Sequence, residues 1–248
     1  FRENEFTRLQ QEFVEHDIVL LTGAAGAGKT RLALEFAERY KKEHKAIVYV
    51  IHNHGLPIYE DLKLYFESPG NYFIVIDDAN QISQLDLVIE YVNKKVDGYN
   101  VKILITVRNY ASRKVKLDIL GIARYSEVIL NSLSDDEIQS LVKNYWGIVN
   151  QDYLNRIVTI AEGNARIAVI AGKIASDANR LQSISDVTGL YSEYYGKAFR
   201  DANLENNLQL QVTAGIIAFL GSIHLDHIES ILDILDVIDL LTFKSCIY

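Results

Sequence analysis

The first half of the chain alternates two hydrophobic patterns: short continuous runs of apolar and β-branched residues, and longer segments in which apolar residues recur every three or four positions. Continuous apolar runs are typical of strands that are buried on both faces of a parallel sheet. The longer segments have the spacing of amphipathic helices. This alternation predicts an α/β fold, a parallel sheet with helices on both faces. The predicted strands are residues 18–22, 46–51, 72–77, 101–106 and 126–130, and the predicted crossover helices are residues 29–43 and 82–96.

Beyond Leu133 the strand pattern fades and helical patterns follow. Ser134 and Glu137 have the spacing of a capping box, in which each side chain satisfies the backbone N–H group of the other residue. Further helices are predicted over residues 151–161, 164–176 and 184–200. We therefore expect an α/β domain over residues 1–133, a helical domain over residues 134–203 and a partial third domain over residues 204–248.

Composition narrows the possible functions. The 25 Lys and Arg residues against 33 Asp and Glu give a net charge of −8, which favours neither a nucleic-acid backbone nor an anionic membrane as a partner. No apolar run reaches the ~18 residues that a membrane-spanning helix needs. The single cysteine, Cys246, cannot form an internal disulfide, so we expect a cytoplasmic protein. The chain contains no Met and begins with Phe, which is typical of a fragment of a longer protein.

The strongest motif lies between the first predicted strand and the first predicted helix. Residues 23–30 read GAAGAGKT and match the pattern G-x-x-x-x-G-K-[S/T] of a phosphate-binding loop. Backbone N–H groups of such a loop surround a β-phosphate, its lysine contacts the β- and γ-phosphates, and its hydroxyl binds Mg²⁺. The alternative is a glycine-rich turn that carries Lys and Thr by chance. The expected nucleotide contacts are Gly23, Ala24, Ala25, Gly26, Ala27, Gly28, Lys29, Thr30 and Arg31, with Thr30 also a Mg²⁺ ligand.

Two acidic residues, Asp77 and Asp78, follow the apolar run of the third predicted strand. Ligands bind at the carboxyl ends of the strands in an open α/β sheet. Asp77 is therefore expected to hold Mg²⁺, and Asp78 to orient or deprotonate the water that attacks the γ-phosphate. Alternatively, Asp78 or Asn80 caps the helix that follows.

The fourth predicted strand brings a hydroxyl and a guanidinium, those of Thr106 and Arg108, to the same edge of the sheet. Arg108 is expected to contact the γ-phosphate through two hydrogen bonds. Lys29, Asp78 and Arg108 are thus the candidate catalytic residues. The alternative for Arg108 is an exposed loop arginine, because three more basic residues follow within residues 113–116.

Two other groups of residues are weaker candidates for a functional role. Residues 163–166, Gly-Asn-Ala-Arg, begin a predicted helix. Arg166 either reaches the nucleotide from the helical domain or lies in solvent while Asn164 caps the helix. His52 and His54 follow the second predicted strand, but no acid or cysteine cluster completes a metal site, which favours a surface loop.

Taken together, these motifs resemble the nucleotide-binding module of the STAND class of signal-transduction ATPases, which includes the NACHT and NB-ARC proteins. Residues 2–5, Arg-Glu-Asn-Glu, resemble an Arg-Glu-x-Glu signature of that class, which implies that Arg2 lies near the adenine. Residues 106–108 fall on its sensor motif, and residues 163–165 on its Gly-x-Pro motif, with Ala165 in place of the proline. Residues 163–166 also resemble the sensor-2 motif of origin-recognition and clamp-loader AAA+ ATPases, which implies a contact between Arg166 and the γ-phosphate.

The resemblance implies a P-loop NTPase fold of the ASCE type, followed by a helical lid domain and the start of a winged-helix-like domain. It implies ATP or ADP with Mg²⁺ as cofactors and a slow ATPase whose nucleotide state is its output. ADP would hold a closed monomer, and ATP would permit self-association. Sensor and effector domains would lie outside this chain, and bacterial members of the class often serve in anti-phage defence.

Two other functions stay open at the level of sequence. An AAA+ ATPase that engages DNA would share the same core, although the acidic C-terminal segment makes nucleic acid an unexpected partner of this fragment. A P-loop kinase acting on a small molecule is disfavoured by the acidic pair Asp77 and Asp78 and by the long helical domain.

Overall fold

The computed structural model describes residues 2–52, 62, 64–66, 68–93 and 98–178, together with a few single or paired residues beyond 178. The chain divides into two compact units, Phe1–Gln182 and Ser183–Tyr248. The domain boundary predicted near Leu133 lies within the first unit. The predicted helix over residues 184–200 and the winged-helix-like segment over residues 204–248 lie outside the described residues, apart from isolated positions.

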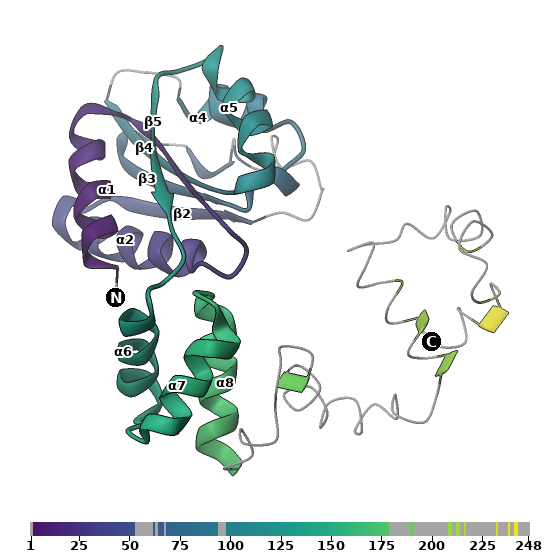
Figure 1. Cartoon of the computed structure of the whole chain (residues 1–248). Coiled ribbons are helices and arrows are strands. Elements are labelled where there is room, and N and C mark those ends of the chain that lie inside the picture. The colour runs from purple at the N-terminus through teal and green to yellow at the C-terminus, as the bar shows by residue number, and fades with distance from the viewer. Residues whose placement is uncertain are drawn as a thin grey trace. The chain divides into compact units, whose positions relative to one another are not determined.

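A five-stranded parallel sheet forms the centre of the first unit (Figure 1). Its strand order is β2-β3-β4-β1-β5, so the carboxyl ends of all five strands lie along one edge. The five predicted strands are confirmed, with ends that differ by at most two residues. They are β1 (Ile18–Gly23), β2 (Ile47–His52), β3 (Gly70–Asp77), β4 (Tyr99–Arg108) and β5 (Tyr125–Leu130).

Helices cover both faces of this sheet, as predicted (Figure 1). On one face, Phe13 and Phe36 pack against Phe73 of β3, with ring centroids 5.3 and 5.6 Å away. A second apolar core fills the opposite face. The helices are α1 (Glu3–Glu15) and α2 (Lys29–His44) on the first face, and α4 (Leu85–Val92) and α5 (Ser112–Leu120) on the second.

Two helices differ from the prediction. α1 is absent from the predicted helices, although its buried residues Phe6, Leu9 and Phe13 have helical spacing. The helix predicted over residues 82–96 begins only at Leu85, because a 3₁₀ turn, η1 (Ala79–Gln81), comes first and Gln84 adopts a left-handed backbone conformation with φ 56°. Residues 94–97 lie outside the described part of the chain.

A bundle of three helices follows β5 (Figure 1). The capping box at its start is confirmed, because Ser134 Oγ accepts from the N–H of Glu137 and Glu137 Oε2 accepts from the N–H of Ser134 at 2.8 Å. Trp146 joins the first helix to the third, since its Nε1 donates to Val169 O at 3.1 Å. The helices are α6 (Asp135–Trp146), α7 (Gln151–Ala161) and α8 (Ala165–Ala178), and the last two confirm the helices predicted over residues 151–161 and 164–176.

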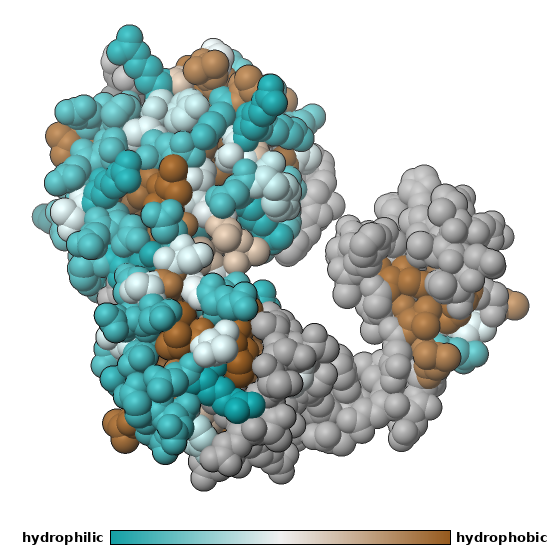
Figure 2. Space-filling model, viewed as in Figure 1, coloured by the Kyte–Doolittle hydropathy of each residue, from teal (hydrophilic) through white to brown (hydrophobic). Residues whose placement is uncertain are grey.

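The surface of the first unit is mostly hydrophilic on the face shown in Figure 2, with hydrophobic residues scattered singly or in small groups. Such scattered exposure is ordinary for a folded domain. Among the helices of the described residues, none combines the length and the apolar character needed to cross a membrane.

The capping box makes the stability of the fold depend on pH. The N–H of Ser134, which donates to the carboxylate, holds the pKa of Glu137 below its ordinary value of 4.5. A carboxyl group whose pKa is lowered by folding contributes stability above its unfolded-state pKa, and this stability is lost as the pH falls through the folded-state pKa. Glutamine keeps an acceptor oxygen for this bond and loses only the charge, so we expect Glu137→Gln to lower the free energy of unfolding by about 0.3–1 kcal/mol at neutral pH, and the difference from wild type to shrink in acid.

Urea unfolding at a series of pH values measures this difference. Asp135→Asn is the matched control, because it removes a charge from the same helical turn and leaves the capping box in place. An equal pH-dependent loss in both variants would assign the effect to the helix dipole and not to the capping box.

Candidate functional site

The P-loop, residues 23–30, joins β1 to α2 at the carboxyl edge of the sheet. Gly26 and Gly28 have φ values of 78° and 97°, in the left-handed region that glycine adopts without strain. Gly23 is required for a different reason, since a Cβ there would lie 2.8 Å from Leu130 O on β5. Gly28 offers no side-chain cap to α2, so the first N–H groups of that helix are available to an anion.

The carbonyl side of the P-loop is held by hydrogen bonds from the protein itself. Lys29 Nζ donates to Gly23 O at 2.9 Å and to Ala24 O at 2.8 Å. The next three carbonyl oxygens, of residues 25–27, accept from donors that lie outside the loop. These are Asn164 Nδ2 to Ala25 O at 3.2 Å, the Arg166 N–H to Gly26 O at 3.2 Å, and Arg2 Nη2 to Ala27 O at 3.4 Å. The N–H of Ala27 also donates within the loop, to Ala24 O at 3.3 Å, so contacts of the protein itself occupy the carbonyl side of the loop.

Lys29 is buried, with 7% of its surface exposed. Burial disfavours the charged ammonium and lowers the pKa of Lys29 from its ordinary value of 10.5; the carboxylate of Asp78 opposes this shift, Arg108 adds to it, and Asp77 also opposes it. The side chain is thus a cation held by carbonyl oxygens and by the field of two carboxylates. A phosphate chain offers it stronger partners than the carbonyl oxygens do.

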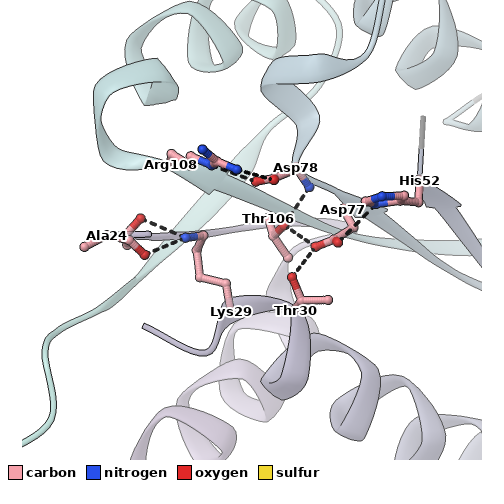
Figure 3. Close-up of polar contacts among 9 residues, drawn as sticks. Ala24, Lys29, Thr30, His52, Asp77, Asp78, Thr106 and Arg108 are labelled. Atoms are coloured by element: carbon pink, nitrogen blue, oxygen red, sulfur yellow. Dashed lines mark hydrogen bonds and ion pairs between the residues drawn. The ribbon is translucent and has the colours of Figure 1, made fainter. Parts of the chain in front are cut away.

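Asp77 is the centre of the polar network at the carboxyl edge (Figure 3). Its Oδ1 accepts hydrogen bonds from Thr30 Oγ1 at 2.8 Å and from Thr106 Oγ1 at 2.7 Å. Its Oδ2 lies 3.3 Å from Nδ1 of His52, the residue paired with Asp77 in the register of β2 and β3. The prediction of a surface loop at His52 and His54 is wrong for His52, which ends β2, while His54 lies outside the described residues. The register of β2 against β3 places His52 beside Asp77.

Asp78 and Arg108 form an ion pair (Figure 3). Arg108 Nη2 donates to Asp78 Oδ2 at 2.9 Å, and Nε lies 3.4 Å from Oδ1. This hydrogen bonding raises the pKa of Arg108. Asp78 itself has a left-handed backbone, φ 50°, and its N–H donates to Thr106 Oγ1 at 2.9 Å. Its side chain makes no capping bond to η1, so the alternative that Asp78 is merely a helix cap is wrong.

The start of α8 reaches the P-loop through Asn164 and through the main chain of Arg166. Asn164 caps the helix, which agrees with the second of the two alternatives given for this motif, because its Oδ1 accepts from the N–H groups of Arg166 and Ile167 at 3.0 and 3.3 Å. The side chain of Arg166 is exposed, as is that of Arg31 on α2.

Arg2 is buried at the entrance to α1, with only 6% of its surface exposed. Besides Ala27 O, its guanidinium donates to Asn131 O at 2.5 Å and to Glu5 Oε1 at 2.8 Å. A cavity of about 430 Å³ lies beside it. Residues of α6 complete its lining: Asp136, Glu137, Ser140, Leu141, Asn144 and Tyr145.

The donor set of the site fits a nucleotide and Mg²⁺. The loop supplies N–H groups and an ammonium to phosphates, while Thr30 and Asp77 place a hydroxyl and a carboxylate 2.8 Å apart. Mg²⁺ in phosphate-binding sites takes one or two protein oxygens and fills its other positions with water and phosphate. Among the described residues, no cluster of three His, Cys, Asp or Glu side chains offers a metal an all-protein site.

Comparison with known proteins agrees with this chemistry. A family model described as Novel STAND NTPase 3 matches residues 1–146. No curated protein sequence gives a significant match. Among solved structures, the chain is similar to RuvB, the Holliday junction branch migration motor of Thermotoga maritima, at 17% identity and a TM-score of 0.57, over 89% of this chain and 77% of that chain.

Two archaeal structures are similar as well. The Orc1 protein of Aeropyrum pernix in complex with DNA has 16% identity and a TM-score of 0.61, over 99% of this chain and 91% of that chain. A Walker-type ATPase of Pyrococcus abyssi has 13% identity and a TM-score of 0.53, over 100% of this chain and 87% of that chain. At these identities the similarity concerns the fold, and it confirms the predicted P-loop ATPase fold.

Thr106→Val tests the hydroxyl that links the two acidic residues. Thr106 is 1% exposed, and its Oγ1 both donates to Asp77 and accepts from the N–H of Asp78. Valine keeps the shape but leaves these groups without that partner, so we expect the free energy of unfolding to fall by about 1–3 kcal/mol. Urea unfolding measures the loss, and Thr106→Ser, which keeps the hydroxyl, is the control. Equal stability of the two variants would contradict the bridging role.

Proposed function

The chain belongs to the Novel STAND NTPase 3 family, and from that premise we propose that it is the ATP-binding and ATP-hydrolysing switch module of a larger STAND ATPase. NTPase chemistry follows from the family and from the P-loop fold. The regulatory role is the proposal, and the ion pair between Asp78 and Arg108 is the observation that supports it most directly.

A bound γ-phosphate would pull the two groups of this ion pair apart, so the state of the pair signals which nucleotide is bound. Arg108 ends β4 and Asp78 follows β3, so both stand at the edge where ligands of an α/β sheet bind. A γ-phosphate competes with the carboxylate for the guanidinium, because phosphate oxygens accept the same paired hydrogen bonds. ADP has no such group and leaves the pair intact. The position of the Arg108 side chain therefore depends on whether ATP or ADP is bound.

The same arrangement assigns a role to each residue of the site. N–H groups of the P-loop and the ammonium of Lys29 hold the β- and γ-phosphates. Thr30 and Asp77 bind Mg²⁺, which neutralises charge on the phosphates. Asp78, once Arg108 has left it, orients or deprotonates the attacking water. The proposed rate of hydrolysis depends on how completely the γ-phosphate draws Arg108 away, because the ion pair keeps the carboxylate of Asp78 from that water.

The base of the nucleotide is assigned to the cavity beside Arg2. Arg2, which lines this cavity, also donates to Ala27 O of the P-loop, and the cavity volume of about 430 Å³ exceeds that of a purine ring. The side chains of Arg31 and Arg166, which are exposed, are also proposed to contact the phosphates. ATP and ADP are the proposed physiological nucleotides.

The output of the switch is proposed to be self-association in the ATP state, governed by sensor and effector domains outside this chain. A cytoplasmic role in anti-phage defence matches the behaviour of bacterial members of the class that the sequence resembles. The second candidate is an AAA+ ATPase that engages DNA. Its support is the similarity in fold to Orc1 in complex with DNA, and the net charge of −8 argues against it.

Lys29→Ala tests nucleotide binding. We expect wild-type protein to release stoichiometric ADP when it is denatured, and the variant to release none. Removal of a charged hydrogen-bond donor to phosphate costs about 1.5–3 kcal/mol, so its affinity for added ATP falls at least about tenfold. Chromatography of the released nucleotide and calorimetric titration give the two readouts.

Lys41→Ala is the matched control, because Lys41 lies on the same helix with an exposed side chain. Unchanged nucleotide affinity in Lys29→Ala would overturn the proposed function. An empty wild-type protein that binds labelled duplex DNA in the presence of ATP, with affinity that falls steeply as salt rises, would favour the second candidate.

Asp78→Asn tests the hydrolytic role of the acid. The amide cannot take a proton from water, so we expect kcat to fall about 10²- to 10³-fold. The dissociation constant for ATP should not rise, because loss of the carboxylate leaves Arg108 to the γ-phosphate. Phosphate release and equilibrium binding are measured on the same samples. Asp86→Asn, at an exposed acid in the first turn of α4, is the control. Wild-type turnover in Asp78→Asn would exclude this residue from catalysis.

A further inference from the structure

We propose that Asn164 is a positioning residue that fastens the P-loop to helix α8, so that phosphate binding and the placement of the helical bundle depend on each other. The inference rests on the proposed function, because it names how the same nucleotide site is regulated. The contact is made by a side-chain amide and by main chain, and not by the guanidinium of Arg166, whose side chain is exposed.

The two ends of the Asn164 carboxamide have separate tasks. Oδ1 accepts from the N–H groups of Arg166 and Ile167 and caps α8. Nδ2 donates to Ala25 O, 139 residues away in the chain. The N–H of Arg166, which Oδ1 orients, also donates to Gly26 O at 3.2 Å. The side chain of Asn164 and the main chain of Arg166 therefore link the first turn of α8 to two consecutive peptide groups of the P-loop.

Both partners of this contact are fixed in place. Gly26 has φ 78°, and a Cβ on it would lie 2.3 Å from Asn164 Oδ1, so only glycine allows the side chain to approach. On the other side, Gly163 has φ 82°, and its carbonyl oxygen accepts from the N–H of Leu133 at 2.9 Å. Asn164 is thus held between the segment that leaves β5 and the loop that binds phosphate.

A peptide group can accept a hydrogen bond at its carbonyl and donate one at its N–H at the same time, and this links the contact with α8 to the contact with phosphate. The carbonyl groups of residues 25 and 26 accept from α8. The N–H that shares a peptide group with the Ala25 carbonyl is the one proposed to face phosphate, because the N–H of the next peptide, on Ala27, donates to Ala24 O at 3.3 Å. A hydrogen bond at a carbonyl polarises its peptide and strengthens the adjoining N–H as a donor. Phosphate on the N–H side strengthens the carbonyl as an acceptor in the same way. The two binding events are therefore coupled, and coupling of this kind is reciprocal.

Asn164→Ser removes the bond from Nδ2 to Ala25 O, here called the latch, and keeps an oxygen that caps α8. Serine caps helices about as well as asparagine, but its hydroxyl is too short to replace the bond from Nδ2 to Ala25 O. We expect a three- to tenfold rise in the dissociation constant for ADP, roughly the size of one neutral hydrogen bond. The stability of the nucleotide-free protein should change little. In hydrogen exchange, ADP should slow the amides at the start of α8 in wild type and leave them unchanged in the variant.

Asn150→Ser is the matched control. Asn150 caps α7 with the same geometry, its Oδ1 accepting from the N–H groups of Asp152 and Tyr153. The same substitution there should leave ADP affinity and the exchange of α8 at wild-type values. Asn164→Asp is the second variant, since a carboxylate keeps the capping acceptor and removes the donor. It should weaken ADP at least as much as serine does, even if Asn164→Ser proves unstable.

The outcomes separate this inference from the proposed function. If wild-type protein binds ADP, and both variants at position 164 retain its affinity together with ADP-dependent protection of α8, the latch is overturned and the function stands. If Asn150→Ser shows the same loss, the effect belongs to helix capping and the latch is again overturned. If wild-type protein binds no nucleotide, the inference fails together with the function.

Discussion

The carboxylate of Asp77 is nearly removed from water, and the carboxyl edge of the sheet is organised around that constraint. A buried charge is tolerated only where hydrogen bonds replace its lost hydration. Here the hydroxyls of Thr30 and Thr106 supply them, and His52 lies against the other oxygen. Satisfying this one group draws together the ends of β2, β3 and β4 and the first turn of α2, and so it sets the geometry in which Lys29 meets Asp78.

Left-handed backbone conformations gather at the same edge. Asp78 has a positive φ, and so do Gly26, Gly28 and Gly163 around the P-loop. A positive φ is unfavourable for aspartate, and such conformations persist where surrounding contacts hold them, most often at functional sites. In this chain the N–H of Asp78 is held by Thr106 and its carboxylate by Arg108. Asp78, the proposed catalytic acid, is therefore held at its backbone N–H and at its carboxylate until a ligand competes for Arg108.

The P-loop is also the point at which separate parts of the first unit meet. Its carbonyl oxygens accept from the segment before α1, through Arg2, and from the start of α8, through Asn164 and the N–H of Arg166. Under the proposed function phosphate binds on the N–H side, and the loop then lies between ligand and helices. In the proposed coupling, a change on one side reaches the other through the peptide groups that both contacts share.

The sequence alone determined the strands and the phosphate loop, because continuous apolar runs and the spacing from Gly23 to Thr30 are local patterns that depend on neighbouring residues. It also placed Asp77, Asp78 and Arg108 at one edge, since parallel strands share their carboxyl end. Only the tertiary structure decided that His52 lies beside Asp77 and that Asn164 reaches the P-loop. Those contacts depend on strand order, on register and on the path of the chain after β5. Such long-range features leave no local pattern, because the partners are brought together by packing and not by spacing.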